Sequence, residues 1–387
     1  MGKNMSDKTV TLPNSNTSIV NLSGAPWLMH EFFAGSGLVA YGLKGMFSPV
    51  WANDICDKKA EVYCSNIKSD HFVLDDIKNI NGNDLPAAHL SWASFPCQDL
   101  SLAGSLAGID AERSGLVWEW LRILQEMRQR PAILLMENVA GLLTANRGEN
   151  YIKLHYALLK LGYRSGAILL NAVHFVPQSR PRVFVIAIKN DVTVPAELTD
   201  KQPNWLHNKA AVSLGRKLPG WIWWKAEKPA RRYTQLTDVI DFSIPYDKDD
   251  VLRLISPRHR KKLEEVDNAV TTGYRRTRNG KQCLELRFDG IAGCLRTPEG
   301  GSSKQFLIVK QNGELQARLL SPREAARLMG APDSFVLPEA YNAGYKAMGD
   351  AVVVPVATFI GESFLIKLSE AAYCERQEFQ EPRVSNR

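Results

Sequence analysis

The sequence predicts an α/β protein in which a doubly wound, mostly parallel sheet is joined to a second, smaller and irregular domain. Short apolar runs alternate with helix-like segments from Trp27 to about Lys189, and this alternation is typical of a parallel sheet covered by helices. The pattern changes after Asn190, where Pro, Gly, Trp and basic clusters replace regular periods. A regular pattern returns at Ser321.

The expected strands of the first half are short apolar runs between polar residues, as in buried parallel strands. They are Trp27–Phe33, Val50–Asn53, Phe72–Leu74, His89–Phe95, Ala132–Met136 and Val183–Ile188. Helices are expected from Gly35 and Gly37 through Leu43, over Lys58–Asn66 and over Gly115–Arg130. The last of these places Leu116, Trp120, Ile123, Leu124 and Met127 on one apolar stripe.

The C-terminal part begins with a clear helix signal. Ser321 is an expected N-cap, Pro322 takes the first helical position, and Glu324 completes a capping box. Gly330 is expected to end this helix. The segment Val352–Leu365 is apolar enough to pack back onto the first domain.

These changes of pattern divide the 387 residues into one large and one smaller unit with flanking segments. The expected limits are a mobile arm (1–24), a first domain (25–190), an irregular domain (191–316), a segment returning to the first domain (317–370) and a polar tail (371–387).

Composition and charge narrow the class of protein. A net charge of +7 and a pI of about 9.0 fit a polyanionic partner. The six cysteines form no Cys-x-x-Cys pair and no Cys/His cluster at zinc spacing, so we expect no metal site and a reducing, cytoplasmic compartment. We also expect no membrane span and no signal peptide.

Two chemically useful residues follow expected strands. Cys97 stands in Ser-Phe-Pro-Cys-Gln-Asp, and Glu137 stands forty positions later in Met-Glu-Asn-Val. In open α/β sheets, ligands bind beyond the carboxyl ends of the strands. A soft nucleophile beside a carboxylic acid suits attack on an electron-poor ring whose nitrogen is protonated at the same time. The alternatives are a buried packing cysteine and a capping carboxylate.

Six short motifs in order resemble those of the cytosine-C5 DNA methyltransferases, of the type II modification kind. They are Phe33-Ala34-Gly35-Ser36-Gly37, Phe95-Pro96-Cys97-Gln98, Glu137-Asn138-Val139, Gln178-Ser179-Arg180-Pro181-Arg182, Leu320-Ser321-Pro322-Arg323-Glu324 and Gly349-Asp350-Ala351-Val352. The resemblance implies an S-adenosylmethionine-dependent methyltransferase sheet in residues 25–190 and a target-recognition domain in residues 191–316.

The resemblance also implies the reaction. The enzyme would move a methyl group from S-adenosylmethionine to C5 of a cytosine flipped out of a specific short duplex DNA sequence. Cys97 would bond to C6, Glu137 would protonate N3, Arg182 would contact O2, and Arg180 would lie beside the pocket. From the residues alone, the two arginines share one face of a strand, and a pair of surface charges is the alternative.

The cofactor residues are expected at the strand ends. Glycines let the backbone approach a ligand, although a plain tight turn is the alternative. Asp54 stands where a carboxylate typically holds ribose hydroxyls, and the resemblance places Asp76 on the adenine amine; a solvated charge is the alternative for both. The full expected set is Phe33, Ala34, Gly35, Ser36, Gly37, Asp54, Ile55, Asp76, Ile77, Pro96, Leu116, Asp350, Ala351 and Val352.

One departure from the family concerns Asp350, because the family usually carries Asn there. An aspartate accepts hydrogen bonds but cannot donate them. If the Asn amide donates to the cofactor, that contact is lost or reversed in this chain, and we expect somewhat weaker cofactor binding with function retained.

Residues 191–316 are expected to read bases in the major groove. The basic clusters Arg231-Arg232, Arg258–Lys262 and Arg275–Arg278 are expected on phosphates, which dominate such interfaces. The run Gly220–Lys225, with three tryptophans, is expected to pack the core of the small domain. Gly300–Ser303 is either a loop close to DNA or a turn. The substrate-binding set is Gln98, Asn138, Val139, Arg231, Arg232, Arg275 and Arg276.

Expected partners are double-stranded DNA and a cognate restriction endonuclease, with a monomeric enzyme in the nucleoid-associated cytoplasm of a bacterial or phage-infected cell. Two alternatives stay open. An RNA cytosine methyltransferase would share the chemistry, but the Cys-Phe-Thr insert usual in relatives that act on tRNA is missing. A DNA-binding relative without catalysis is the other, and the intact Cys97, Glu137 and Arg182 argue against it.

Overall fold

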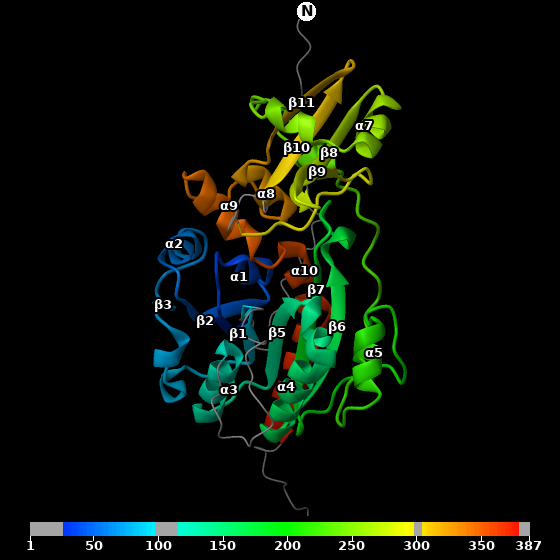
Figure 1. Ribbon diagram of the computed structural model, residues 1–387. Helices are drawn as coiled ribbons and strands as arrows, with labels where there is room; N and C mark the ends of the chain where they lie inside the picture. Colours follow the sequence, from blue (N-terminus) through cyan, green and yellow to red (C-terminus); the bar gives the residue numbers. More distant parts are fainter. Residues whose placement is uncertain (1–25, 97–114, 298–303, 379–387) are drawn as a thin grey trace, which may run out of the picture.

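The computed structural model describes residues 26–96, 115–297 and 304–378, which form two stacked units (Figure 1). The lower unit holds a seven-stranded sheet in the order β3-β2-β1-β4-β5-β7-β6. Its strands are β1 (Trp27–Phe32), β2 (Phe47–Asp54), β3 (Phe72–Leu74), β4 (Leu90–Ala93), β5 (Ile133–Val139), β6 (Tyr163–Asn171) and β7 (Pro181–Lys189). Neighbours from β3 to β5 are parallel, and β7 runs antiparallel to both β5 and β6. The predicted mostly parallel sheet is confirmed.

The antiparallel partner β7 lengthens β5 beyond its expected end. Glu137 pairs with Phe184 and Val139 pairs with Arg182. Glu137 therefore lies inside the strand, and the expectation that it follows the strand is wrong. Because β7 supplies hydrogen-bond partners up to Val139, the strand has no reason to stop at Met136.

Helices cover both faces of this sheet. Leu135 of β5 lies in one apolar core with α1 (Leu38–Gly42), α10 (Val354–Ile360) and α11 (Ile366–Glu378). Its neighbour Leu134 lies in a second core with α3 (Leu116–Glu126) and α4 (Glu149–Lys160). Successive side chains of a strand point to opposite faces, so the sheet is wound on both sides. Helix α2 (Asp57–Asn66) joins the parallel strands β2 and β3.

Helix α3 is shorter than predicted. It ends at Glu126 rather than Arg130, although Met127 still contributes a buried side chain. Pro131 disfavours helical geometry in the residue before it, and the chain already leaves the helix at Met127.

The C-terminal helices return to the first unit as predicted. α8 (Pro322–Leu328) begins with the expected capping box between Ser321 and Glu324, and Gly330 follows it in a left-handed conformation. After α9 (Tyr341–Gly349), α10 packs so closely on α1 that a Cβ on Gly42 would lie 2.7 Å from the carbonyl oxygen of Val354. Thr358 also donates a 2.7 Å hydrogen bond to the Gly42 carbonyl.

The segment Tyr341–Cys374 is long and apolar enough, by length and composition alone, to cross a membrane. Length and composition alone do not contradict the expectation of no membrane span. Of its most apolar stretch, 56% is buried inside the protein. Its helices share the apolar core of α1 and the sheet, which is the environment of a core helix.

The upper unit is an antiparallel sheet in the order β11-β10-β8-β9. Its strands are β8 (Ala269–Arg278), β9 (Lys281–Leu286), β10 (Gln305–Gln311) and β11 (Glu314–Leu319), and β11 runs past the expected domain limit at residue 316. A separate small core includes Leu263 of α7 (Pro257–Glu264) and Ile308 of β10.

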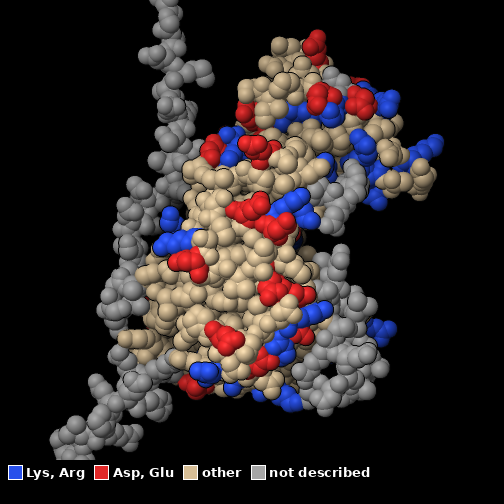
Figure 2. Space-filling model, turned by 90° about the vertical axis from the view of Figure 1, so that its left-hand side faces the viewer, with Lys and Arg blue, Asp and Glu red and all other residues tan. Residues whose placement is uncertain are grey.

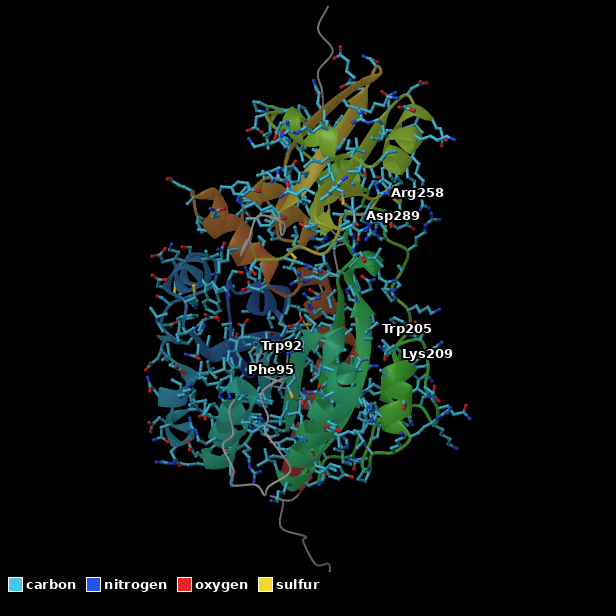
Figure 3. All side chains as sticks on the ribbon, in the orientation of Figure 1. Trp92, Phe95, Trp205, Lys209, Arg258 and Asp289 are labelled. Carbon is cyan, nitrogen blue, oxygen red and sulfur yellow. The ribbon has the colours of Figure 1, made fainter. Side chains whose placement is uncertain are left out.

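The first part of the irregular segment packs on the lower unit instead. Trp205 and Lys209, which starts α5 (Lys209–Gly215), lie beside the lower sheet, whereas Arg258 and Asp289 lie in the upper unit (Figure 3). Trp224 is fully buried, and its ring nitrogen donates to the Ile186 carbonyl at 3.2 Å. The tryptophan run is core packing, as expected, but it packs the sheet of the lower unit rather than the small domain. The short helix α6 (Leu236–Val239) follows.

Candidate active site

The carboxyl ends of the parallel strands meet at one edge of the lower sheet. Phe32 at the end of β1 pairs with Ala93 at the end of β4, and Ala93 pairs with Met136 of β5. On its other side, Phe32 pairs with Asn53 of β2. The predicted glycine loop and the segment before Cys97 therefore leave the sheet at the level of Glu137, which follows Met136 within β5. Ligands bind at this edge in this type of fold.

The glycine loop is fixed to the end of β2 by Asp54. The Asp54 carboxylate is buried and accepts hydrogen bonds from the backbone N–H groups of Gly35 and Cys56, both at 2.9 Å. The alternative of a solvated charge is therefore wrong for Asp54. Gly37 has a positive φ, and a Cβ there would lie 2.9 Å from the Tyr63 ring. The loop thus needs glycine for both conformation and space.

The next predicted cofactor residues differ in exposure. Ile55 directly follows Asp54 and is 68% exposed. Asp76 is half-buried beyond the end of β3 and accepts a 3.0 Å hydrogen bond from the Lys78 amide, while Ile77 is buried. An apolar side chain and two carboxylates therefore line neighbouring strand ends.

Glu137 and Arg182 form a buried ion pair at the end of β5 and the start of β7. Arg182 Nε lies 2.9 Å from Glu137 Oε1, and the Glu137 side chain is 8% exposed. Burial raises the pKa of Glu137 above its usual range, although the charges of Arg182 and Arg180 oppose the shift. The carboxyl group therefore keeps a proton to higher pH than an exposed glutamate does.

Asn138 joins the acid strand to the segment that leads to Cys97. Its side-chain amide donates a 2.9 Å hydrogen bond to the Phe95 carbonyl. Phe95 is buried and Pro96 is exposed. Cys97 and Gln98 lie outside the described residues, so their predicted roles stay predictions.

Arg180 is a buried tether rather than a surface charge. Its guanidinium group donates to the carbonyls of Leu295 at 2.8 Å, Gly349 at 3.1 Å and Ala351 at 2.8 Å. The side chain is 2% exposed, so the surface alternative is wrong. Arg180 ties the start of β7 to two distant segments and so holds Arg182 in register.

Two further contacts were not predicted from the sequence. Lys59 of α2 pairs with Asp350, with Nζ 2.5 Å from Oδ2 across 291 positions of sequence. Gln178 donates to the Leu328 carbonyl at 2.8 Å and accepts from the Leu295 amide at 3.0 Å. Gln178 could have been found because it is the first residue of the Gln178–Arg182 motif. Nothing local in the sequence connects Lys59 with Asp350.

The last motif closes over the glycine loop. Ser36 donates a 2.8 Å hydrogen bond to the Ala347 carbonyl, three residues before Asp350. Ala351 is half-buried and Val352 is buried beside it. Leu116, at the first position of α3, is half-buried. These residues remain cofactor candidates.

The predicted phosphate-binding arginines have different environments. Arg231 is exposed, whereas Arg232 donates a 3.1 Å hydrogen bond to the Val173 carbonyl of the lower unit. The Arg275 guanidinium lies 5.4 Å from the Phe306 ring centre, and that of Arg276 lies over Tyr274. Figure 2 shows several Lys and Arg side chains on the upper unit.

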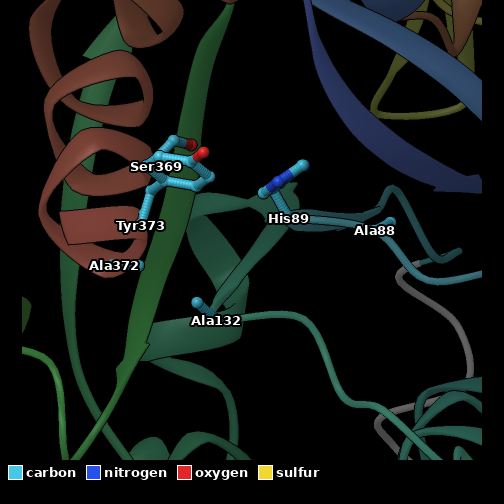
Figure 4. A pocket seen from close by; sticks show the side chains of 6 residues that line it. All are labelled: Ala88, His89, Ala132, Ser369, Ala372 and Tyr373. Carbon is cyan, nitrogen blue, oxygen red and sulfur yellow. The ribbon is translucent and has the colours of Figure 1, made fainter. Parts of the chain in front are cut away.

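A small pocket lies far from this site, at the opposite edge of the sheet (Figure 4). It is lined by residues at the starts of β4 and β5 and by α11, namely Ala88, His89, Ala132, Ser369, Ala372 and Tyr373. The pocket is therefore separate from the strand ends that hold the candidate active site.

Comparison with known proteins identifies similar chains. The sequence model of the C-5 cytosine-specific DNA methylase family matches residues 28–365. Type II methyltransferase M.Bsp6I of Bacillus sp. (strain RFL6) is 29% identical over 340 residues, covering 86% of this chain and 96% of that protein. Type II methyltransferase M.HhaI of Haemophilus parahaemolyticus is 26% identical, covering 85% and 91%.

Solved structures share the fold. The S. pombe Dnmt2 methyltransferase aligns with a TM-score of 0.54 at 18% identity, covering 87% of this chain and 98% of that one. The Entamoeba histolytica methyltransferase EhMeth aligns with a TM-score of 0.57 at 15% identity, covering 92% and 99%.

Proposed function

The chain belongs to the C-5 cytosine-specific DNA methylase family, and from this premise we propose that it transfers a methyl group from S-adenosylmethionine to C5 of a cytosine flipped out of a specific short duplex DNA sequence. Its class is that of the DNA cytosine-5-methyltransferases. The observation that carries the proposal is the buried Glu137–Arg182 pair, held by Asn138 next to the segment that leads to Cys97.

The acceptor chemistry follows from these side chains. The Cys97 thiolate adds to C6 of the cytosine while protonated Glu137 donates its proton to N3, which makes C5 nucleophilic. Arg182 orients Glu137 through its Nε atom and is proposed to contact O2 of the base, while its Nη1 group also donates to the Pro181 carbonyl. After the methyl group reaches C5, a base removes the C5 proton and the C6–S bond breaks to release the Cys97 thiolate. N3 returns its proton to Glu137, which regenerates the acid.

The donor residues fit S-adenosylmethionine, which supplies the methyl group when bound. The exposed Ile55 offers an apolar surface for an adenine ring at the end of β2. Asp54 is the residue for the ribose hydroxyls, and Asp76 is the residue for the adenine amine. The glycine loop lacks the full Gly-x-Gly-x-x-Gly pattern of dinucleotide sites.

The upper unit is proposed to recognise DNA. The target base cannot react while stacked, so it leaves the duplex. Lys and Arg side chains on the upper unit offer positive charge to the phosphates (Figure 2). Exposed Arg231 and the stacked Arg275 and Arg276 are proposed to contact phosphates. Residues 191–316 remain the proposed recognition domain, with Arg232 also anchoring it to the lower unit.

The biological setting is proposed from the relatives. The similar chains are named type II methyltransferases of bacteria. We therefore propose a monomeric cytoplasmic enzyme that protects DNA from a cognate restriction endonuclease.

Bisulfite sequencing of DNA from cells that express the protein tests this function. A single short sequence should become resistant to conversion, and cells expressing Cys97→Ala should show none. Full conversion of DNA with resistant cytosines in tRNA would favour the RNA alternative instead. Full conversion of both nucleic acids by a folded, DNA-binding protein would favour a relative without catalysis.

A further inference from the structure

Asp350 lies between two parts of the candidate active site. The first is the Glu137–Arg182 pair, called the acceptor site below, and the second is the glycine loop Phe33–Gly37. Its two neighbours in the chain, Gly349 and Ala351, offer their carbonyls to Arg180, which precedes Arg182 by two residues. The charge on Asp350 also contributes to the raised pKa of Glu137, after burial and against the two arginines. The backbone of Asp350 is therefore fixed to the acceptor side.

The side chain of Asp350 turns to the donor side. Its Oδ2 atom lies 2.5 Å from Lys59 Nζ, and Lys59 lies in the first turn of α2, the helix that follows Asp54. Burial alone would lower the pKa of Lys59, but the charges of Asp350 and Asp54 outweigh burial and raise it. The lysine therefore stays cationic and holds the carboxylate in one orientation.

A second contact places this pair over the glycine loop. Ser36 is bonded to the Ala347 carbonyl in the same turn of chain that carries Asp350. The Asp350 side chain is 37% exposed, and its other oxygen, Oδ1, accepts no hydrogen bond from the described residues. One carboxylate oxygen is thus held by Lys59, and the partly exposed carboxylate keeps its other oxygen for a ligand.

The donor's chemistry matches this position. Its sulfur joins the adenosine to the amino-acid part and carries the methyl group, so it must lie between the strand ends near Asp54 and the acceptor site near Glu137. The amino-acid part branches from the same sulfur and ends in a cationic ammonium group. A carboxylate between the two sites is suited to accept hydrogen bonds from that ammonium.

We propose that Lys59 is a positioning residue of the donor site, which holds Asp350 so that its free oxygen binds the ammonium group of the donor's amino-acid end. The inference rests on the proposed function and deepens it. It also explains how this chain uses an aspartate where the family usually has Asn: the lysine balances the added charge and fixes its direction.

Calorimetric titration of the full chain without DNA tests the inference with two probes. S-adenosylhomocysteine contains the amino-acid end, and 5′-methylthioadenosine lacks it. Lys59→Met should weaken S-adenosylhomocysteine binding about tenfold, in line with the loss of one charge-assisted contact. Binding of 5′-methylthioadenosine should not change. Lys59→Arg should restore the first affinity, and Lys58→Met, at the exposed neighbour on α2, is the matched control.

A double-mutant cycle separates positioning from general support. In an Asp350→Asn background, Lys59→Met should cost little affinity for S-adenosylhomocysteine, because no carboxylate remains to be held. Equal losses for both probes, or no loss for S-adenosylhomocysteine, would overturn the inference. If the unaltered protein bound neither probe, the proposed donor site itself would fail and the inference with it.

Discussion

The two units hold their functional side chains in opposite ways. In the lower unit, Glu137 and Arg180 are buried, and each is bonded to partners from distant segments. In the upper unit, Arg278 is 68% exposed and pairs with Glu285 on the surface. Breaking a buried pair leaves an uncompensated charge and costs about 3–5 kcal/mol, whereas exposed pairs contribute about 0–1 kcal/mol.

In the proposed function, this difference separates chemistry from DNA recognition. The reacting groups need one geometry, and buried bonds between strand ends impose it. The proposed DNA recognition relies on exposed charges whose individual loss the fold tolerates. Substitutions in the lower unit should therefore change turnover, and substitutions on the upper unit should change DNA affinity.

The largest expected effect is the loss of covalent capture. DNA with 5-fluorocytosine at the target position should form an adduct that survives denaturing gels, because fluorine at C5 cannot leave as a proton does. The adduct should require S-adenosylmethionine. Cys97→Ala should abolish it while DNA binding persists through phosphate contacts. An adduct that forms with the Cys97→Ala protein would contradict the role of this cysteine.

The next effect concerns the acid. Glu137→Gln cannot give a proton to N3, so kcat should fall about 10²- to 10⁴-fold. In the unaltered enzyme the protonated form is active, so kcat should decline as pH rises through the raised pKa of Glu137. The variant should lose this decline. Glu119→Gln on α3 is a control, and a kcat for Glu137→Gln equal to that of the control would rule out the acid role.

On the upper unit, smaller effects are expected. Log affinity for DNA should fall with log salt with a slope of about −4 or steeper if about five phosphates are neutralised. Arg258→Ala and Lys261→Ala, at exposed positions of α7, should each flatten the slope by about 0.9. At saturating DNA, kcat should not change.

The control for this prediction is Lys44→Ala. Lys44 is exposed just before β2, at the edge of the lower sheet opposite the candidate active site. A slope that is insensitive to the α7 variants, or one that Lys44→Ala alters equally, would show that the basic charge of the upper unit is incidental.

The same contrast explains how much could be predicted from the sequence. Strands such as Phe72–Leu74 and the capping box at Ser321 were predicted because local residue patterns determine them. The pairing of β7 with β5 was missed, and with it the position of Glu137, because strand order depends on contacts across the sheet.

Within the candidate site, motif residues were found and their partners were not. Asp54 was predicted at its strand end, but its bonds to Gly35 and Cys56 follow from the folded loop. Lys59 was missed because an ion pair across 291 positions has no local signature. The tryptophan run was recognised as core packing, yet composition could not tell which core Trp224 enters.

The smallest expected effect concerns folding stability. It tests whether a buried carboxyl of the lower unit makes stability depend on pH more than an exposed carboxyl of the upper unit does. Glu31 of β1 is 1% exposed, and its Oε2 atom lies 3.4 Å from the hydroxyl of Tyr63. The Tyr63 ring lies against Gly37 of the glycine loop. Burial raises the pKa of Glu31 from 4.5 to about 8. The folded state therefore keeps a proton that the unfolded chain releases, and stability falls as pH rises from the unfolded pKa through about 8.

Glu31→Gln keeps the shape of the side chain without its ionisation, so this part of the pH dependence should vanish. At pH 8 the variant should melt a few degrees higher than the unaltered protein, and near pH 4.5 the difference should be absent. The difference between the two proteins cancels the contributions of other buried groups such as His30. Glu285→Gln, in the exposed pair of the upper unit, should leave the melting profile above pH 5 unchanged. If Glu31→Gln and the unaltered protein showed the same melting temperatures at every pH, the buried Glu31 carboxyl would not be protonated in the folded state.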